Sequence, residues 1–526
     1  MSVFRPCLAL GLICVILAAC TLGPDYKKPD DLAAAKPGTP LYRARQMTMA
    51  TPPQRWWEQL HDPVLTQLEA MALADSPNLK ALGSRVQAAR QLVLQRHANQ
   101  LPRIGADASA AKFGKNEIIE DRVDDYRDRV TDSTYSFLGH NRIGDTVANN
   151  IRDRVNHRDR LREVYRAGFD ASWDTDMFGR LSRATEEAKA NAEASIAELA
   201  DAQVQLAAEI GEVYLNYRGA QQRLALNQEN LDAARQSVDL VRQRFGRGMA
   251  TDLDVQRALA QQHQQELSIP HIQGQLQEAR DQLALMVGRE PGALDTLLKD
   301  VKPLPKMPDE IKVDDAAAVL QRRPDVRQAE RELAASSARI GQAIALKFPH
   351  ISLLGSLNMT VANPGDFTSN AASYLVAPML QWSVFDFGRN KALVGQAKAA
   401  YQANLARYQS KVLSALQDAN SALIRFGTAR SQLVMAKRTQ ATTHRSHELM
   451  EQRRKAGLTT LIDVLDVQRQ RLQSDDAEVQ AQTQLLVNFV ALQKSLGLGW
   501  QLPQPEVADN GQPAEKDSKV QVKKAL

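Results

Sequence analysis

The sequence predicts an α+β membrane protein that consists of two copies of one structural unit. Three observations lead to this prediction: an internal repeat, four segments with the alternating pattern of membrane strands, and helical stretches too long for a globular core. The 526 residues include 66 basic and 61 acidic ones, and the net charge of +5 is too even to indicate a nucleic-acid partner. Aromatic residues make up only 5%, which is typical of long helices packed through small side chains.

The repeat is clearest at two glycine-centred turns. Gly248 in "RFGRGMATDLDVQR" and Gly457 in "RRKAGLTTLIDVLDVQR" lie 209 residues apart. Upstream, Pro102 corresponds to Pro349 at an offset of 247 residues, so copy one contains 38 additional residues. These fall in the charged stretch 114–160, which has the mixed charge of a solvated loop.

Each copy contains two segments in which apolar and polar residues alternate. The four segments are 103–110, 165–174, 349–359 and 374–384. At ~9–11 residues they have the length of strands that cross an outer membrane, and their aromatic residues lie near the ends, where a girdle would form. A soluble antiparallel sheet has the same alternation, so the pattern alone leaves both interpretations open.

Each strand pair is followed by a predicted helical hairpin. We expect helices over 181–245 and 390–455, each ~100 Å long, and return helices over 252–287 and 461–496. Helices of this length must pack on one another, or on other copies of the chain, as a bundle or tube. Four strands cannot close a barrel, and an open edge in lipid leaves backbone groups unpaired. To cross the membrane the chain must therefore oligomerise: two copies give eight strands, which their own side chains fill, and three copies give twelve, which could leave a lumen.

The N-terminus is a predicted targeting segment. A short apolar stretch ends in "LAAC", which resembles a lipoprotein signal, so residues 1–19 would be removed and Cys20 would be acylated. Cys7 and Cys14 would leave with the peptide, and Thr21 fits sorting to the outer membrane. The alternative is an ordinary secretory peptide with an incidental cysteine.

Several motifs resemble those of the outer membrane factor family, the TolC-like channels, and above all its lipoprotein branch. They are "GPDYKKP" (23–29), "WWEQLHDPVLTQL" (56–68), "LPRIGADAS" (101–109), "WDTDMFGR" (173–180), "FDFGR" (385–389) and the two turns. The resemblance runs from about residue 20 to 500. It implies a homotrimeric twelve-stranded β-barrel with four strands per chain, continued by a long α-helical coiled-coil tunnel. It implies no role for the charged insertion 114–160.

The resemblance also implies a gate at the periplasmic end of the tunnel. It assigns the charged gate positions to Asp466 and Arg469 and an apolar constriction to Ile462. These residues are spaced i, i+4 and i+7, on one face of a helix. The alternative is an ordinary exposed pair on a helix surface.

The two turns resemble the family's docking site for a periplasmic adaptor. The residues concerned are Gly248, Thr251, Gly457, Thr459 and Thr460. Glycine at a helix end and threonine before the next helix also serve simply as caps, which is the alternative interpretation.

By this resemblance the protein is the outer membrane exit duct of a tripartite efflux pump, without catalytic residues, metal or cofactor apart from the lipid on Cys20. Its expected partners are two further copies of itself, an adaptor, a proton-driven inner-membrane pump and outer membrane lipid. Two alternatives remain: a duct for type I protein secretion, and a lipid-anchored coiled-coil scaffold without a pore. The sequence does not identify the cargo.

The predicted organisation has six parts. They are a signal peptide (1–19), a lipidated N-terminal segment (20–60), repeat one (61–300, turn near 246–252), a connector or equatorial belt (301–315), repeat two (316–500, turn near 456–461) and a flexible C-terminal tail (501–526).

Overall fold

The structure is a computed structural model that describes residues 21–29, 41, 48–112, 145 and 163–500. The predicted signal peptide with Cys20, the C-terminal tail and nearly all of the insertion lie outside the described residues, as does the side chain of Ile462. Residue contacts divide the chain into two compact units. Unit 1 comprises 1–28, 87–192 and 331–406, and unit 2 comprises 29–86, 193–330 and 407–526.

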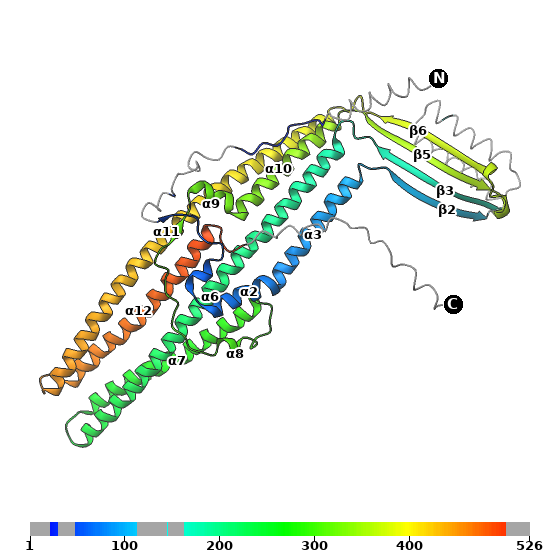
Figure 1. Ribbon diagram of the computed structural model, residues 1–526. Coiled ribbons are helices and arrows are strands. Elements are labelled where there is room, and N and C mark those ends of the chain that lie inside the picture. Colours follow the sequence, from blue (N-terminus) through cyan, green and yellow to red (C-terminus); the bar gives the residue numbers. More distant parts are fainter. Residues whose placement is uncertain (1–20, 30–40, 42–47, 113–144, 146–162, 501–526) are drawn as a thin grey trace, which may run out of the picture. The chain divides into compact units, whose positions relative to one another are not determined.

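Two helical hairpins dominate the chain (Figure 1). Helices α6 (Arg180–Gly246) and α7 (Asp252–Met286) form the first, and α11 (Arg389–Lys455) and α12 (Leu461–Ser495) form the second. The long helices have 67 residues each and the return helices 35 each, which agrees with the repeat. Pro270 lies inside α7, which continues through it. Among the helices of the described residues, none combines the length and the apolar character that a membrane crossing requires.

Shorter elements complete each copy. They are η2 (Trp56–Leu60), α2 (Pro63–Asp75), α3 (Pro77–Ala98), α8 (Asp295–Leu298), α9 (Ala316–Arg322), α10 (Pro324–Ala345), η3 (Pro364–Asp366) and η4 (Ser369–Ala371). In unit 2, β1 (Thr48–Met49) pairs in parallel with β4 (Lys312–Val313). This pairing connects the predicted N-terminal segment to the predicted connector.

Unit 1 contains the four-stranded sheet that the alternating segments predict. Its strands β2 (Arg103–Lys112), β3 (Glu163–Asp174), β5 (His350–Val361) and β6 (Ala372–Gln381) are antiparallel and follow this order in space. The sequence pattern extends the last strand to residue 384, and this was wrong by three residues. Gln381 already pairs with His350, the first residue of β5, and Pro349 before it has no N–H to continue the ladder.

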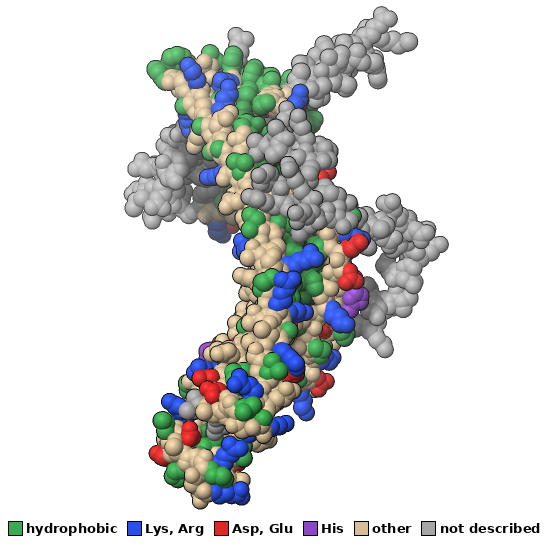
Figure 2. All heavy atoms as spheres, turned by 90° about the vertical axis from the view of Figure 1, so that its left-hand side faces the viewer, with side chains coloured by type: hydrophobic (Ala, Val, Ile, Leu, Met, Phe, Trp, Pro, Cys, Tyr) green, Lys and Arg blue, Asp and Glu red, His purple; other side chains and the backbone are tan. Residues whose placement is uncertain are grey.

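The apolar face of the sheet is uncovered by the rest of the described chain. Phe169, Leu357 and Tyr374 lie opposite one another on successive strands, and 58%, 48% and 84% of their surfaces are exposed. Figure 2 shows hydrophobic side chains gathered at the top of the view, in the part of unit 1 that carries the sheet. A soluble sheet would bury such a face, whereas lipid accepts it.

The core of unit 2 forms around the tryptophan pair of "WWEQLHDP". Trp56 and Trp57 are buried, and the Trp56 ring lies 6.3 Å from that of Phe489 on α12. A Cβ at Gly211 of α6 would fall 2.5 Å from Trp56, so glycine here makes room for the ring and does not end the helix. These tryptophans therefore pack in the core of unit 2.

Candidate functional site

The candidate site consists of the two helical turns of unit 2 and the helix ends beside them. In the first turn Gly248 has a φ of 70°, and its N–H donates to the carbonyl of Phe245 at 2.9 Å. In the second turn Gly457 has a φ of 74°, and its N–H donates to Arg454 at 3.0 Å. Glycine is favoured at both positions because a side chain would strain this left-handed conformation.

Threonine caps begin both return helices. Thr251 and Asp254 form a capping box at α7, and Thr460 and Asp463 form the equivalent box at α12. The hydroxyl of Thr460 donates to the Asp463 carboxylate at 2.6 Å, and its N–H donates at 3.0 Å. These bonds lower the pKa of the Asp463 carboxyl, and those from Thr251 do the same for Asp254. Both boxes therefore hold the turns rigid, and their threonines act as caps.

The second turn carries one additional hydroxyl. Thr459 Oγ1 donates to Asp463 at 2.9 Å and contacts Met450 Sδ at 3.4 Å, whereas the first turn has Ala250 at the corresponding position. The second turn is thus tied more firmly to its own helices than the first.

The predicted gate residues lie on the first turns of α12. Arg469 donates to Asp466 at 3.2 Å, and their side chains are 55% and 58% exposed. In a single chain they form an ordinary surface pair, because a ring of carboxylates requires further copies. The copy-one counterparts are Arg257 and Ala260, so the aspartate–arginine pair belongs to the second hairpin alone.

Apolar side chains project at both turns. Met249 and Leu458 occupy equivalent positions and are 64% and 69% exposed, and Leu253 on α7 is 57% exposed. Figure 2 shows charged and hydrophobic side chains mixed over this lower end. Exposed apolar side chains at rigid turns suit a protein–protein contact.

A titratable cluster behind the second turn was not predicted from the sequence. His444 Nε2 lies 2.6 Å from Asp475 Oδ1, between α11 and α12. His447, one helical turn further, is half-buried, and burial followed by the charge of Arg471 lowers its pKa. Alignment of the two copies at the offset of 209 would have revealed both histidines, because Arg235 and Val238 stand at these positions in copy one.

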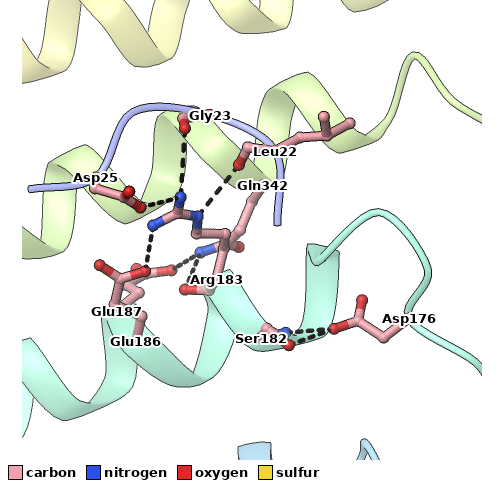
Figure 3. Close-up of polar contacts among 9 residues, drawn as sticks. All are labelled: Leu22, Gly23, Asp25, Asp176, Ser182, Arg183, Glu186, Glu187 and Gln342. Carbon is pink, nitrogen blue, oxygen red and sulfur yellow. Dashed lines mark hydrogen bonds and ion pairs between the residues drawn. The ribbon is translucent and has the colours of Figure 1, made fainter. Parts of the chain in front are cut away.

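The residues that follow Cys20 are held in unit 1 by Arg183 of α6 (Figure 3). The side chain of Arg183 is only 4% exposed and donates to the carbonyls of Leu22 and Gly23 at 3.2 and 3.3 Å. It also pairs with Asp25 at 2.8 Å and with Glu186 at 2.7 Å. The segment 22–25 is therefore bound to α6.

The acidic pair Asp174 and Asp176 has a structural role. Asp176 accepts from the N–H groups of Leu181 and Ser182 at 2.7 Å and so caps α6, while Asp174 lies 3.0 Å from His350 of β5. In the described part of the chain, no group of three or more His, Cys, Asp or Glu residues is arranged to hold a metal ion.

Comparison with known proteins gives a consistent result. The family model for outer membrane efflux proteins matches residues 141–289 and 316–498, more than half of the chain. The outer membrane protein OprJ of Pseudomonas aeruginosa is 28% identical over 500 residues, covering 93% of this chain and 95% of its own. The probable efflux pump outer membrane protein TtgC of Pseudomonas putida is 26% identical, covering 94% and 95%.

Solved structures give the same answer for the fold. The outer-membrane channel OprN superposes with a TM-score of 0.77 at 31% identity, covering 91% of this chain and 100% of its own. The open-state channel MtrE of Neisseria gonorrhoeae has a TM-score of 0.73 at 24% identity and supports the fold alone. The predicted fold class and family are confirmed. The chain belongs to the outer membrane efflux protein family and is the outer membrane exit duct of a tripartite pump, a conduit and not an enzyme.

Proposed function

We propose that three copies of this chain form the duct, and that the second hairpin of each copy carries the gate. The sheet supplies four strands with an exposed apolar face and two open edges, so several chains must complete it. Three chains give twelve strands, enough to leave a lumen, whereas an eight-stranded barrel is filled by its own side chains.

The observation that supports the gate is the position of Asp466 and Arg469 beside a rigid turn. In a trimer, three Asp466 carboxylates would approach the axis, and each already has Arg469 of its own chain at 3.2 Å. Like charges near an axis attract cations or pair with neighbouring arginines, and either arrangement narrows the passage. Ile462, one helical turn earlier, would add an apolar ring.

We assign adaptor docking to the two turns. Gly248, Thr251, Gly457, Thr459 and Thr460 shape surfaces that expose Met249 and Leu458. Adaptor binding at the second turn would displace α12, which carries the proposed gate residues. An inner-membrane pump, proton-driven in this proposal, supplies the energy.

The lipid anchor on Cys20 remains part of the proposal. Its support is the signal-like sequence together with the Arg183 contacts that fix Leu22 and Gly23 beside α6. Mass spectrometry of the mature N-terminus would test it, since an unmodified Cys20, or cleavage elsewhere, would contradict acylation.

The cargo is proposed as small organic solutes chosen by the pump. The names of the relatives include pyoverdine export and toluene efflux, which are different small molecules. Protein secretion by a type I system remains the second candidate, because the duct itself selects weakly.

Single-channel conductance tests the gate. Asp466→Ala should raise the conductance of the purified channel, because it removes the carboxylate ring and frees Arg469. Glu448→Ala is the matched control, since Glu448 forms a similarly exposed pair with Arg445 at 2.9 Å on α11. Equal conductance of both variants and the parent would contradict the gate assignment.

Photo-crosslinking in cells from an unnatural residue at Thr460 tests docking. Capture of an adaptor that belongs to a proton-driven pump supports efflux. An adaptor of an ATP-driven exporter would favour protein secretion, and no adaptor would count against the turn as the docking site.

A further inference from the structure

The face of the sheet that lies behind the exposed apolar one is not uniformly polar. Phe169 and Leu357 are opposite each other on the apolar face, so their sequence neighbours Gly168 and Asn358, also opposite each other, lie on the other face. We call this second face the inner face. In the proposed trimer it lines the lumen of the barrel, so its residues are those that a passing solute meets.

In copy one the inner face carries charged side chains. Arg166 of β3 pairs with Asp107 of β2 at 3.5 Å. Asp170 of β3 lies on the same face and is exposed, and it has no hydrogen bond or ion pair with any described residue. Copy one therefore offers the lumen a free carboxylate.

In copy two the corresponding positions are apolar. The offset between the copies is 247 for the first strand of each pair and 209 for the second. These offsets put Leu354 in the place of Asp107 and Leu375 in the place of Arg166. The ion pair of copy one is thus replaced by two leucines.

The apolar residues of copy two form a patch on the inner face of β5 and β6, which we call the lumen patch. It consists of Leu354, Leu375, Ala377 and Met379. Leu354 lies directly opposite Ala377, and these two residues are 8% and 3% exposed. Leu375 and Met379 flank Ala377, because residues on one face of a strand are two positions apart. Positions that face a barrel lumen are ordinarily polar, so an apolar patch here is a distinct surface.

The free carboxylate borders this patch across the β3–β5 pairing. Asp170 is opposite Ser356, and Leu354 is the next residue of β5 on the inner face. Diagonal neighbours of this kind have Cα atoms about 7–8 Å apart. Ser356 is in turn opposite Leu375 on β6. A single small molecule can therefore reach the charge and the apolar surface together.

We propose that Asp170 and the lumen patch form a contact site for amphipathic cations on the inner wall of the barrel. An aromatic or alkyl body would lie on Leu354 and Leu375, with its cationic group near the Asp170 carboxylate. Sites for small organic molecules are mostly apolar and contain a few polar groups that set orientation and selectivity. The inference rests on the proposed trimer and narrows its cargo from small organic solutes to those with a positive charge.

The arrangement of charges favours a cation over an anion. The guanidinium of Arg166 is already paired with Asp107. Arg103 lies on the inner face of β2, two strands from Leu354, whereas Asp170 is only one strand away. Neighbouring strands are about 4.8 Å apart, so the carboxylate is the nearer charge to the patch.

Photolabelling tests the site without depending on the gate. The probe is an aryl azide that carries a trimethylammonium group, and the matched probe carries a sulfonate on the same aryl azide. Each probe is illuminated with the full chain in reconstituted membranes, and the labelled residues are located by mass spectrometry. We expect the cationic probe to label Met379 of the lumen patch by a factor of about 3 or more above the anionic probe.

Variants separate the two parts of the site. Asp170→Asn, and the double variant Leu354→Thr with Leu375→Thr, should each reduce the labelling of Met379 by a factor of about 3 or more, because lumen substitutions tune selectivity. Asp170→Glu keeps the charge and should be labelled as the parent is. The same holds for Val164→Thr, which changes an apolar residue of the inner face outside the patch.

Three results would overturn the site. They are equal labelling by the two probes, undiminished labelling in Asp170→Asn, and labels confined to Tyr374 and Leu380, which lie on the apolar face and would be reached from lipid. If native mass spectrometry shows trimers, each of these results leaves the proposed duct intact. Monomers or dimers would instead overturn the proposed trimer, and the lumen site with it.

Discussion

His444 Nε2 lies 2.6 Å from Asp475 Oδ1 in the second hairpin, at the place where Arg235 lies 3.4 Å from Glu266 in the first. The two hairpins thus share a cross-helix pairing, which uses an arginine in the first hairpin and a histidine in the second. The same exchange recurs at the next turn, where His447 replaces the buried Val238. At these two positions the second hairpin thus has histidines where the first has arginine and valine.

The first prediction concerns pH and His447. Burial and the charge of Arg471 lower the pKa of His447, so the folded state favours the neutral imidazole. The stability that depends on this neutral form is fully present above the ordinary pKa of about 6.5 and is lost as the pH falls through the lowered pKa. The groups facing it include Arg471 from α12, and His444, Glu448 and Glu451 from α11. Between pH 7.5 and 5.5 the second hairpin should loosen relative to the first.

Hydrogen exchange, corrected for the intrinsic pH effect, measures this difference. The ratio of protection between 441–475 and 232–266 should fall by a factor of about 3 or more on acidification. His447→Val, which copies the first hairpin, should abolish the change. An equal change of protection in parent and variant would show that His447 does not cause the loosening.

The second prediction concerns the cap of α12. Thr460→Ala removes a side-chain acceptor for the N–H of Asp463 and the hydroxyl donor to its carboxylate. Loss of an N-cap costs about 1 kcal/mol, so exchange in the first turn of α12 should accelerate about fivefold. Thr459→Ala removes a single hydroxyl bond to Asp463 and should have a smaller effect. A larger effect of Thr459→Ala would show that the contact with Met450 governs the turn.

Much of this architecture could be predicted from the sequence because it follows from periodicity. Alternation with a period of two defines the strands, and glycine with threonine defines the turns to within a residue or two. The end of β6 could not be predicted in this way, because Gln381 is the last residue with a partner in β5. The alternating pattern predicts which side chains lie on which face of the sheet. The residue at which a strand ends depends instead on where the neighbouring strand stops offering backbone hydrogen bonds.

The candidate site was predictable only in part. The capping roles follow from residue type, but the contacts of Arg183 with Leu22 and Gly23 join segments 160 residues apart, and no local pattern indicates them. His444 and His447 look isolated until the two copies are aligned. Long-range contacts of this kind can be found only by aligning the two copies or from the structure itself.

The third prediction concerns Arg183. Arg183 donates to the carbonyls of Leu22 and Gly23 and pairs with the carboxylates of Asp25 and Glu186. The Arg183→Gln variant has no charge and too few N–H groups to make all four contacts. The segment should detach from α6, and trypsin should cleave after Lys27 at least fivefold faster. The control is Arg180→Gln, because Arg180 is 40% exposed and pairs only loosely with Asp174 at 3.6 Å. Equal cleavage of the two variants would show that other contacts hold the segment.

The fourth prediction concerns a buried carboxyl in the core of unit 2. Glu69 of α2 is 0% exposed, and neither side-chain oxygen has a hydrogen-bond partner among the described residues. Burial raises the pKa of this carboxyl well above its usual range, so the folded state favours the protonated form. The stability that depends on this proton is present below the ordinary pKa of glutamate and is lost as the pH rises through the raised value.

Glu69→Gln keeps the shape of the side chain and removes the titration. Thermal unfolding between pH 5 and 8 should show that the parent loses stability with rising pH and that the variant loses less, so that the variant is the more stable protein at pH 8. Glu58→Gln is the control, because Glu58 is 49% exposed and pairs with Arg55. Parallel curves for the parent and Glu69→Gln would mean that Glu69 ionises without cost, which requires a cation or donor close to its carboxylate.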